Sequence, residues 1–171
     1  MLVRNEIIIK WLLYAAAALL CLMVQGAILQ RITIWGVIPF LYPLAAVIPA
    51  TYESPVAGTV FALCMGIVCD LLLPGSAPCL YTLIFPVAGL CASLISRSLL
   101  PAGFACSLAA AAAAFILTDG FRCLLLWASG QDPWLTGGSV MVREFCVTAP
   151  LVLPVTVLFA AVARKVRHIC D

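Results

Sequence analysis

The chain has 171 residues, of which 65% are hydrophobic and only 9% are charged, and its formal net charge is +2. In soluble domains about a quarter of the residues are charged, so this composition excludes a soluble globular protein. It predicts a single integral membrane domain over residues 1–171, with room for about six spans and very short connections.

The apolar runs predict an all-α, polytopic bundle of six transmembrane helices. In chain order, the expected helices cover residues 11–29, 34–52, 55–73, 80–95, 104–127 and 140–163. The second run contains Pro39, Pro43 and Pro49. Because proline removes a backbone donor and clashes with the preceding turn, we expect this helix to be kinked or to begin only near Pro39.

The third run carries clear helix signals at its ends. Ser54 suits the N-cap and Pro55 the first helical position, while Pro74-Gly75 is expected to end the helix. The helix between them is just long enough to cross a bilayer core of about 30 Å.

Small residues follow one face of this third helix. Gly58, Ala62 and Gly66 recur at steps of four, and Gly89 and Ser93 have the same spacing in the fourth helix. Lipid supplies no hydrophobic drive for helix association, so close packing depends on small residues that let backbones approach. The sequence therefore predicts a helix-packing face made of these five residues.

Asp70 continues the same stripe, deep in an apolar run. An ionised carboxylate facing lipid costs about 2.5 to 3.5 kcal/mol even on the lenient insertion scale. We therefore expect Asp70 to face the protein interior and to have a partner there.

Basic residues in the short flanking segments predict the orientation. With six spans both termini share one side, which holds most of the flanking basic residues: Arg4, Lys10, Arg97, Arg164, Lys165 and Arg167. The opposite side holds only Arg31 and Arg143. Because cytoplasmic loops carry the excess of Lys and Arg, we expect both termini in the cytoplasm.

This topology brings the polar residues within the helices to one depth, in the outer half of the membrane. The predicted network consists of Gln25, Asp70, Asp119, Arg122, Arg143 and Glu144. We expect Asp70 to pair with Arg122 or Arg143, while Asp119 and Glu144 take the remaining charge, because an unpaired buried ion costs several kcal/mol. Two interpretations stay open: the network only stabilises the fold, or it forms a substrate or proton site.

Other chemistry has little support in the sequence. The nine cysteines form no C-x-x-C pair and nearly all lie in apolar runs, where cysteine behaves as a small hydrophobic residue. The single histidine, His168, lies in a basic tail that we expect to contact anionic lipid head groups. We therefore predict no metal, cofactor, nucleic acid or catalytic residue, and no enzymatic activity.

The order of several short motifs resembles the rod shape-determining protein MreD family. The matching features, in chain order, are Gln25, Gly36 with Pro39, Gly58, Gly66 with Asp70-Leu71-Leu72, Leu80-Tyr81 with Leu83, and Gly89. They cover residues 24–95, and the chain departs from the family pattern at Phe40, Cys79 and Pro86. Each motif alone is generic to membrane helices, so their order and spacing carry the resemblance.

The resemblance implies a non-enzymatic scaffold of the cell-wall elongation machinery in the inner membrane. Its partners would be the membrane-anchored MreC, the peptidoglycan synthases and the MreB cytoskeleton. The implied fold is similar to that of the substrate-binding subunits of energy-coupling-factor vitamin transporters.

Such a transporter subunit is the alternative function, with the polar network as its outward-facing ligand pocket. Its docking pattern, A-x-x-x-A on the first helix, is absent here, although Ala109 with Ala113 and Ala110 with Ala114 provide it in the fifth helix.

Overall fold

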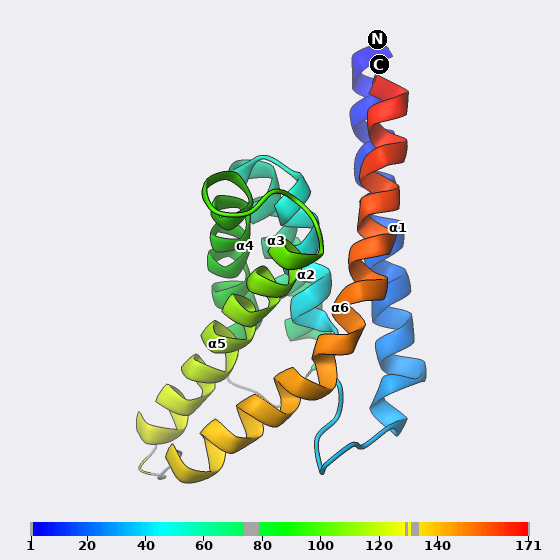
Figure 1. Cartoon of the computed structure of the whole chain (residues 1–171). Helices are drawn as coiled ribbons and strands as arrows, with labels where there is room; N and C mark the ends of the chain where they lie inside the picture. Colours follow the sequence, from blue (N-terminus) through cyan, green and yellow to red (C-terminus); the bar gives the residue numbers. More distant parts are fainter. Residues whose placement is uncertain (1, 74–78, 129, 131–133, 171) are drawn as a thin grey trace.

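A computed structural model shows an all-helical bundle (Figure 1). It describes residues 2–73, 79–128, 130 and 134–170, with the backbone alone for residues 2–6, 134–136 and 167–170. The helices of this described part are α1 (Leu2–Ala27), the short 3-10 helix η1 (Leu29–Arg31), α2 (Tyr42–Tyr52), α3 (Pro55–Leu72), α4 (Leu80–Ser98), α5 (Phe104–Ala128) and α6 (Trp134–Cys170). All but η1 and α2 are long and apolar enough to cross a membrane, which confirms the predicted class, a multi-pass helical membrane protein.

Most helix boundaries lie close to those expected from the apolar runs. The α3 helix begins as predicted: Pro55 is the first residue, and the Ser54 side chain accepts a hydrogen bond of 3.3 Å from the Ala57 N–H. The main differences in length are that α1 begins nine residues earlier than residue 11 and that α6 extends beyond residues 140–163 at both ends. The predicted Pro74-Gly75 stop and much of the loop after α5 lie outside the described residues.

The second helix is shorter than the predicted range of 34–52. It begins at Tyr42 and has 11 residues, so it is only about 16 Å long, roughly half of a bilayer core. The reason lies upstream, where Ile34 and Val37 exchange two backbone hydrogen bonds, of 2.9 and 3.0 Å, around Trp35 and Gly36. Both central residues have positive φ angles, 53° and 78°, which is the geometry of a tight type I′ turn and cannot continue into a helix.

The short α2 helix lies at the centre of the molecule. It packs against each of the other five α-helices, and all of its residues from Tyr42 to Thr51 are buried. Non-helical backbone next to a half-length helix is tolerated at membrane depth only where protein surrounds it. The bundle surrounds α2 together with Pro39 and Leu41 directly before it, whereas the turn at residues 34–37 is mostly exposed.

The outer helices are arranged unevenly around α2. The α3 and α4 helices form the most extensive pair, and α1 packs on α6 and α2 (Figure 1). The 37-residue α6 contains Pro150 and Pro154, and Figure 1 shows the helix changing direction midway, from orange to red, as expected where proline interrupts the hydrogen-bond ladder. Its C-terminal end and the N-terminal end of α1 lie at the same end of the molecule (Figure 1), in agreement with termini on one side of the membrane.

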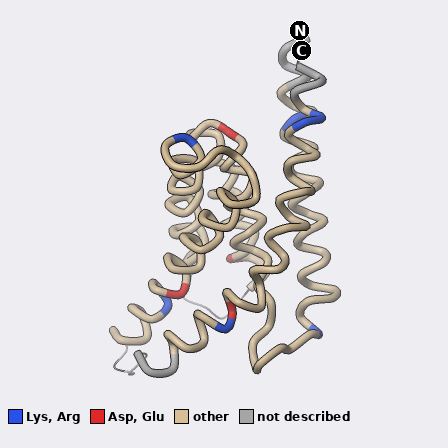
Figure 2. Tube along the Cα trace, in the orientation of Figure 1, with Lys and Arg blue, Asp and Glu red and all other residues tan. Residues whose placement is uncertain are grey.

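Charged residues occupy a small part of this bundle. In Figure 2 the Lys, Arg, Asp and Glu positions lie mostly toward the two ends of the bundle, and the long helical stretches between them are tan. Lys10 of α1 and Glu53, between α2 and α3, form an ion pair with an Nζ–Oε2 distance of 2.6 Å. This pair ties α1 to the α2–α3 corner and was not anticipated from the sequence.

Candidate functional site

Asp70 lies near the end of α3, and its carboxylate binds the beginning of α4. The N–H groups of Tyr81 and Thr82 donate to the two carboxylate oxygens at 3.0 and 2.8 Å, and the Thr82 hydroxyl donates to Oδ2 at 2.5 Å. The first N–H groups of a helix have no partner within the helix and carry the positive end of its dipole. Asp70 therefore caps α4 from the neighbouring helix.

The prediction that Asp70 pairs with Arg122 or Arg143 is wrong. Within the described residues, all of the hydrogen bonds of Asp70 go to Tyr81 and Thr82, and no ion pair joins it to an arginine. A helix N-terminus can satisfy a carboxylate without an opposite charge, because several aligned N–H groups replace the missing cation.

The small residues of α3 and α4 meet as predicted. A Cβ added to Gly66 would lie 2.5 Å from the Tyr81 carbonyl oxygen, and one added to Gly58 would lie 2.7 Å from the Ser93 hydroxyl. A Cβ on Gly89 would lie 2.7 Å from the Ala62 Cβ. All five predicted packing residues are buried, and the contact of Gly66 with the beginning of α4 brings Asp70 within reach of its partners.

Gln25 of α1 and Thr148 of α6 hold the backbone that precedes α2. The Gln25 amide nitrogen donates to the Pro39 carbonyl at 3.0 Å, and its oxygen accepts from the Leu41 N–H at 2.7 Å. The Phe40 N–H donates to Thr148 Oγ1 at 3.1 Å. These side chains supply the hydrogen bonds that a helix would otherwise make internally, as the apolar environment requires.

Two serines of α4 do the same at the other end of α2. The Ser93 hydroxyl donates to the Ala50 carbonyl at 2.8 Å, and the Ser96 hydroxyl donates to the Thr51 carbonyl at 2.6 Å. The last carbonyls of a helix lack partners of their own, so these bonds satisfy α2 at its C-terminus. Side chains of α1, α4 and α6 thus hold both ends of α2.

Arg122 of α5 is held by an acid, a phenol and two rings. Its guanidinium lies 3.5 Å from Asp119 Oδ1 and donates a hydrogen bond to the Tyr81 hydroxyl. It also lies over the rings of Phe40 and Tyr81, at 5.4 and 5.6 Å from their centres. Because Tyr81 also binds Asp70 through its N–H, the α3–α4 cap and the α5 ion pair are linked through one residue.

An open cavity of about 340 Å³ lies beside Arg122, where α1, α5 and α6 face the segment before α2. Its lining residues are Gln25, Gln30, Gly36, Val37, Ile38, Phe40, Tyr42, Leu73, Arg122 and Glu144. Glu144 of α6 is 9% exposed, and the structure gives it no hydrogen-bond or ion-pair partner among the described residues.

The predicted polar network therefore forms in part. Gln25, Arg122 and Glu144 border one cavity, and Asp119 contacts Arg122. Arg143 does not join them, because its side chain is exposed and the described residues offer it no ion pair. The sequence did not indicate the roles of Phe40, Tyr81 and Thr148.

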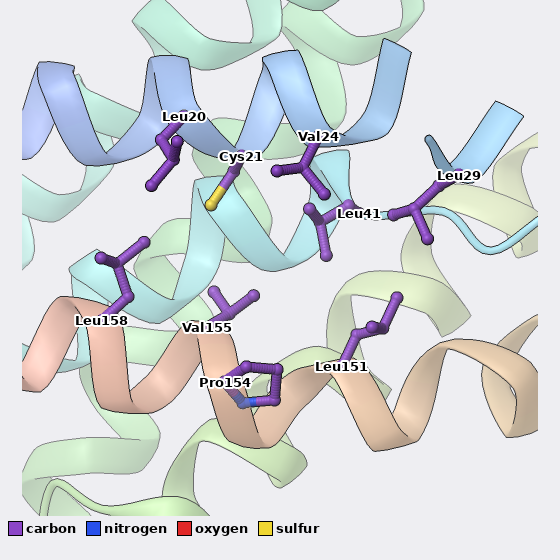
Figure 3. A pocket seen from close by; sticks show the side chains of 9 residues that line it. All are labelled: Leu20, Cys21, Val24, Leu29, Leu41, Leu151, Pro154, Val155 and Leu158. Atoms are coloured by element: carbon purple, nitrogen blue, oxygen red, sulfur yellow. The ribbon is translucent and has the colours of Figure 1, made fainter. Parts of the chain in front are cut away.

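A second cavity, of about 150 Å³, lies between α1 and α6 near the bend of α6. Figure 3 shows side chains of both helices, with Leu29 and Leu41, pointing into it: Leu20, Cys21, Val24, Leu151, Pro154, Val155 and Leu158. All of them are apolar apart from the thiol of Cys21. This cavity offers packing space but no reactive or hydrogen-bonding group.

Metal ligation has no support in the described part of the chain, where no cluster of three or more His, Cys, Asp or Glu residues is placed to hold an ion. The cysteines of that part are free thiols, and the side chains of His168 and Cys170 lie outside it. The two features that bear on function are the polar cavity at Arg122 and the α2 helix, whose ends are held by side chains of neighbouring helices.

The chain matches no family model, and comparisons with curated proteins and with solved structures likewise found no significant match.

Proposed function

We propose that the chain is a non-enzymatic membrane scaffold of the MreD type, which binds MreC in the inner membrane and helps to organise peptidoglycan synthases with the MreB cytoskeleton. The proposal rests on the sequence resemblance over residues 24–95. The observation that supports it most is that several motif residues of this resemblance lie in one connected set of contacts around α2, whereas Leu71, Leu72 and Leu83 are exposed and lie outside it.

The motif residues in this set have specific positions. Gln25 holds the backbone before α2, and Gly58, Gly66 and Gly89 line the close approach of α3 to its neighbours. Asp70 caps α4 through the N–H of Tyr81. Motifs scattered through unrelated helices by chance would not be expected to build one structural unit, so their connection favours a shared origin with the scaffold family.

A pull-down of the tagged full-length chain from its host in mild detergent, with mass spectrometry of the captured proteins, tests the proposal. The expected result is recovery of MreC together with cell-wall synthases, above the level captured by an unrelated tagged membrane protein. Recovery of paired ATPases with a large transmembrane coupling protein, and no MreC, would contradict it.

One observation favours the alternative, a substrate-binding subunit of an energy-coupling-factor transporter. The polar cavity beside Arg122 is open and large enough for a small ligand, as such a subunit requires. The same pull-down separates the two functions, because their partners belong to different protein classes.

A further inference from the structure

Glu144 is the acid among the described residues that line the cavity beside Arg122, and its carboxylate has no hydrogen-bond or ion-pair partner among them. Isolated carboxylates are costly to bury, and inside membrane proteins ionisable residues almost always pair or face water. A buried carboxylate that borders an open cavity is therefore positioned to receive a group from outside the chain.

Two other polar side chains of the cavity, Gln25 and Arg122, are already engaged. Gln25 binds Pro39 and Leu41 through both of its amide atoms, and Arg122 binds Asp119 and Tyr81. The ion pair of Arg122 is with Asp119, so Glu144 has none among the described residues. The Glu144 carboxylate therefore lacks a positively charged hydrogen-bond donor.

The walls of the cavity fit a small cation. Its volume of about 340 Å³ lies at the lower end of the range for small-molecule sites, and the rings of Phe40 and Tyr42 contribute to its lining. Aromatic rings attract ammonium groups through their negative faces. The Arg122 guanidinium already lies over the Phe40 ring, whereas no cation lies over the Tyr42 ring among the described residues. Phe40 and Tyr42 pack edge to face, with ring centres 5.3 Å apart, so the two rings form a defined wall.

We propose that the cavity between Gln25, Arg122 and Glu144 binds a small organic cation through a primary ammonium group that donates hydrogen bonds to the Glu144 carboxylate. The ammonium group can belong to a water-soluble amine or to an ethanolamine lipid head group, since these two share the recognised chemistry. The proposal does not depend on the scaffold function.

Thermal unfolding of the purified full-length chain in detergent micelles tests this binding. Ethanolamine, choline and ethylene glycol are titrated separately at constant ionic strength. We expect ethanolamine to raise the unfolding midpoint by about 2 to 4 °C once it exceeds its dissociation constant about fivefold. Choline, which lacks N–H donors, and ethylene glycol, which lacks charge, should raise it less. Equal shifts from all three compounds would overturn the proposal.

Two neighbouring residues provide matched variants. Glu144→Gln should abolish the ethanolamine shift, whereas Arg143→Gln should retain it, because Arg143 is exposed and does not line the cavity. An unchanged shift in Glu144→Gln would also overturn the proposal. If Glu144→Gln does not fold, the comparison of the three compounds on the unaltered chain still tests the proposal.

Nanodiscs identify the source of the ammonium group. Stabilisation by phosphatidylethanolamine over phosphatidylcholine, in the unaltered chain but not in Glu144→Gln, would assign the site to a lipid head group. Stabilisation by free ethanolamine alone would assign it to a soluble amine. No stabilisation by either source would overturn the proposal.

Discussion

At the scale of single residues, Asp70 shows how an acid inside a membrane protein is satisfied by the first turn of a neighbouring helix, without an opposite charge. Its three hydrogen bonds all come from the first turn of α4, whose free N–H groups need acceptors as much as the carboxylate needs donors. The acid and the helix end therefore stabilise each other, and this contact fixes the angle at which the chain returns from α3 into α4.

Replacement of Asp70 by asparagine should lower the free energy of unfolding by about 1 to 3 kcal/mol, because the amide has one acceptor oxygen and no charge. Equilibrium unfolding in mixed micelles measures the loss. Thr82→Val removes only the hydroxyl donor and should cost less than Asp70→Asn. An Asp70→Asn chain as stable as the unaltered one would show that the cap contributes nothing.

Among the described glycines of the α3–α4 contact, Gly66 is the one whose added Cβ would lie nearest to another backbone. Gly66→Ala should destabilise the fold by about 1 to 3 kcal/mol, since the added Cβ would lie within 3 Å of Tyr81 and Thr82 backbone atoms, which cannot move aside cheaply. The same unfolding measurement checks this value. Gly120→Ala is the matched control, because its Cβ meets nothing within 4 Å and alanine favours the helix by about 1 kcal/mol. Equal effects of the two changes would contradict the tight contact.

At the scale of elements, α2 is set apart by the source of its terminal hydrogen bonds. A helix of 11 residues leaves a large share of its backbone groups without internal partners. Side chains of α4 bind its last carbonyls, and side chains of α1 and α6 bind the backbone directly before it. These partners are Gln25, Thr148, Ser93 and Ser96, which belong to α1, α6 and α4. The position of α2 thus depends on contacts far apart in the chain.

Gln25→Leu should lower the free energy of unfolding by about 2 to 4 kcal/mol, because it leaves the Pro39 carbonyl and the Leu41 N–H buried without partners. Gln30→Leu is the matched control: Gln30 is exposed, and its substitution should have little effect. The two variants are compared by thermal unfolding in the same detergent. A loss of similar size in both would argue against the role of Gln25.

The positions of most helices could be predicted from the sequence. The apolar runs located the long helices, Ser54 and Pro55 marked the beginning of α3, and the spacing of small residues marked its face toward α4. These signals are local, since each depends on residues within one or two turns.

Other features could not be predicted because their partners have no local signal. The three prolines allowed either a kinked or a short second helix, and only the turn at Trp35 and Gly36 excludes the long one. The bond between Phe40 and Thr148 joins residues 108 positions apart, and nothing in either segment indicates the other. Two of the three donors to Asp70 are backbone N–H groups, which every residue except proline carries.

At the scale of the whole molecule, the arrangement of spans determines where the termini lie. Five helices can cross the membrane, and the segment from residue 32 to α2 must provide the remaining crossing if both ends share a side. Figure 1 shows the N-terminal end of α1 next to the C-terminal end of α6. Compartment-specific reporters fused to either terminus should therefore report the same compartment. The distribution of basic residues predicts that this compartment is the cytoplasm. Reporters that place the termini in opposite compartments would contradict this topology.

In this structure α2 is a short, buried helix against which each of the other α-helices packs. Hydrogen–deuterium exchange of the purified full-length chain tests this arrangement most directly, because exchange reports local opening residue by residue. The amides of residues 43–52 should exchange slowly, apart from the prolines, which carry none, and the exposed turn at residues 34–37 should exchange rapidly. Uniform slow exchange from residue 34 to residue 52 would instead indicate a full-length second span and contradict the account.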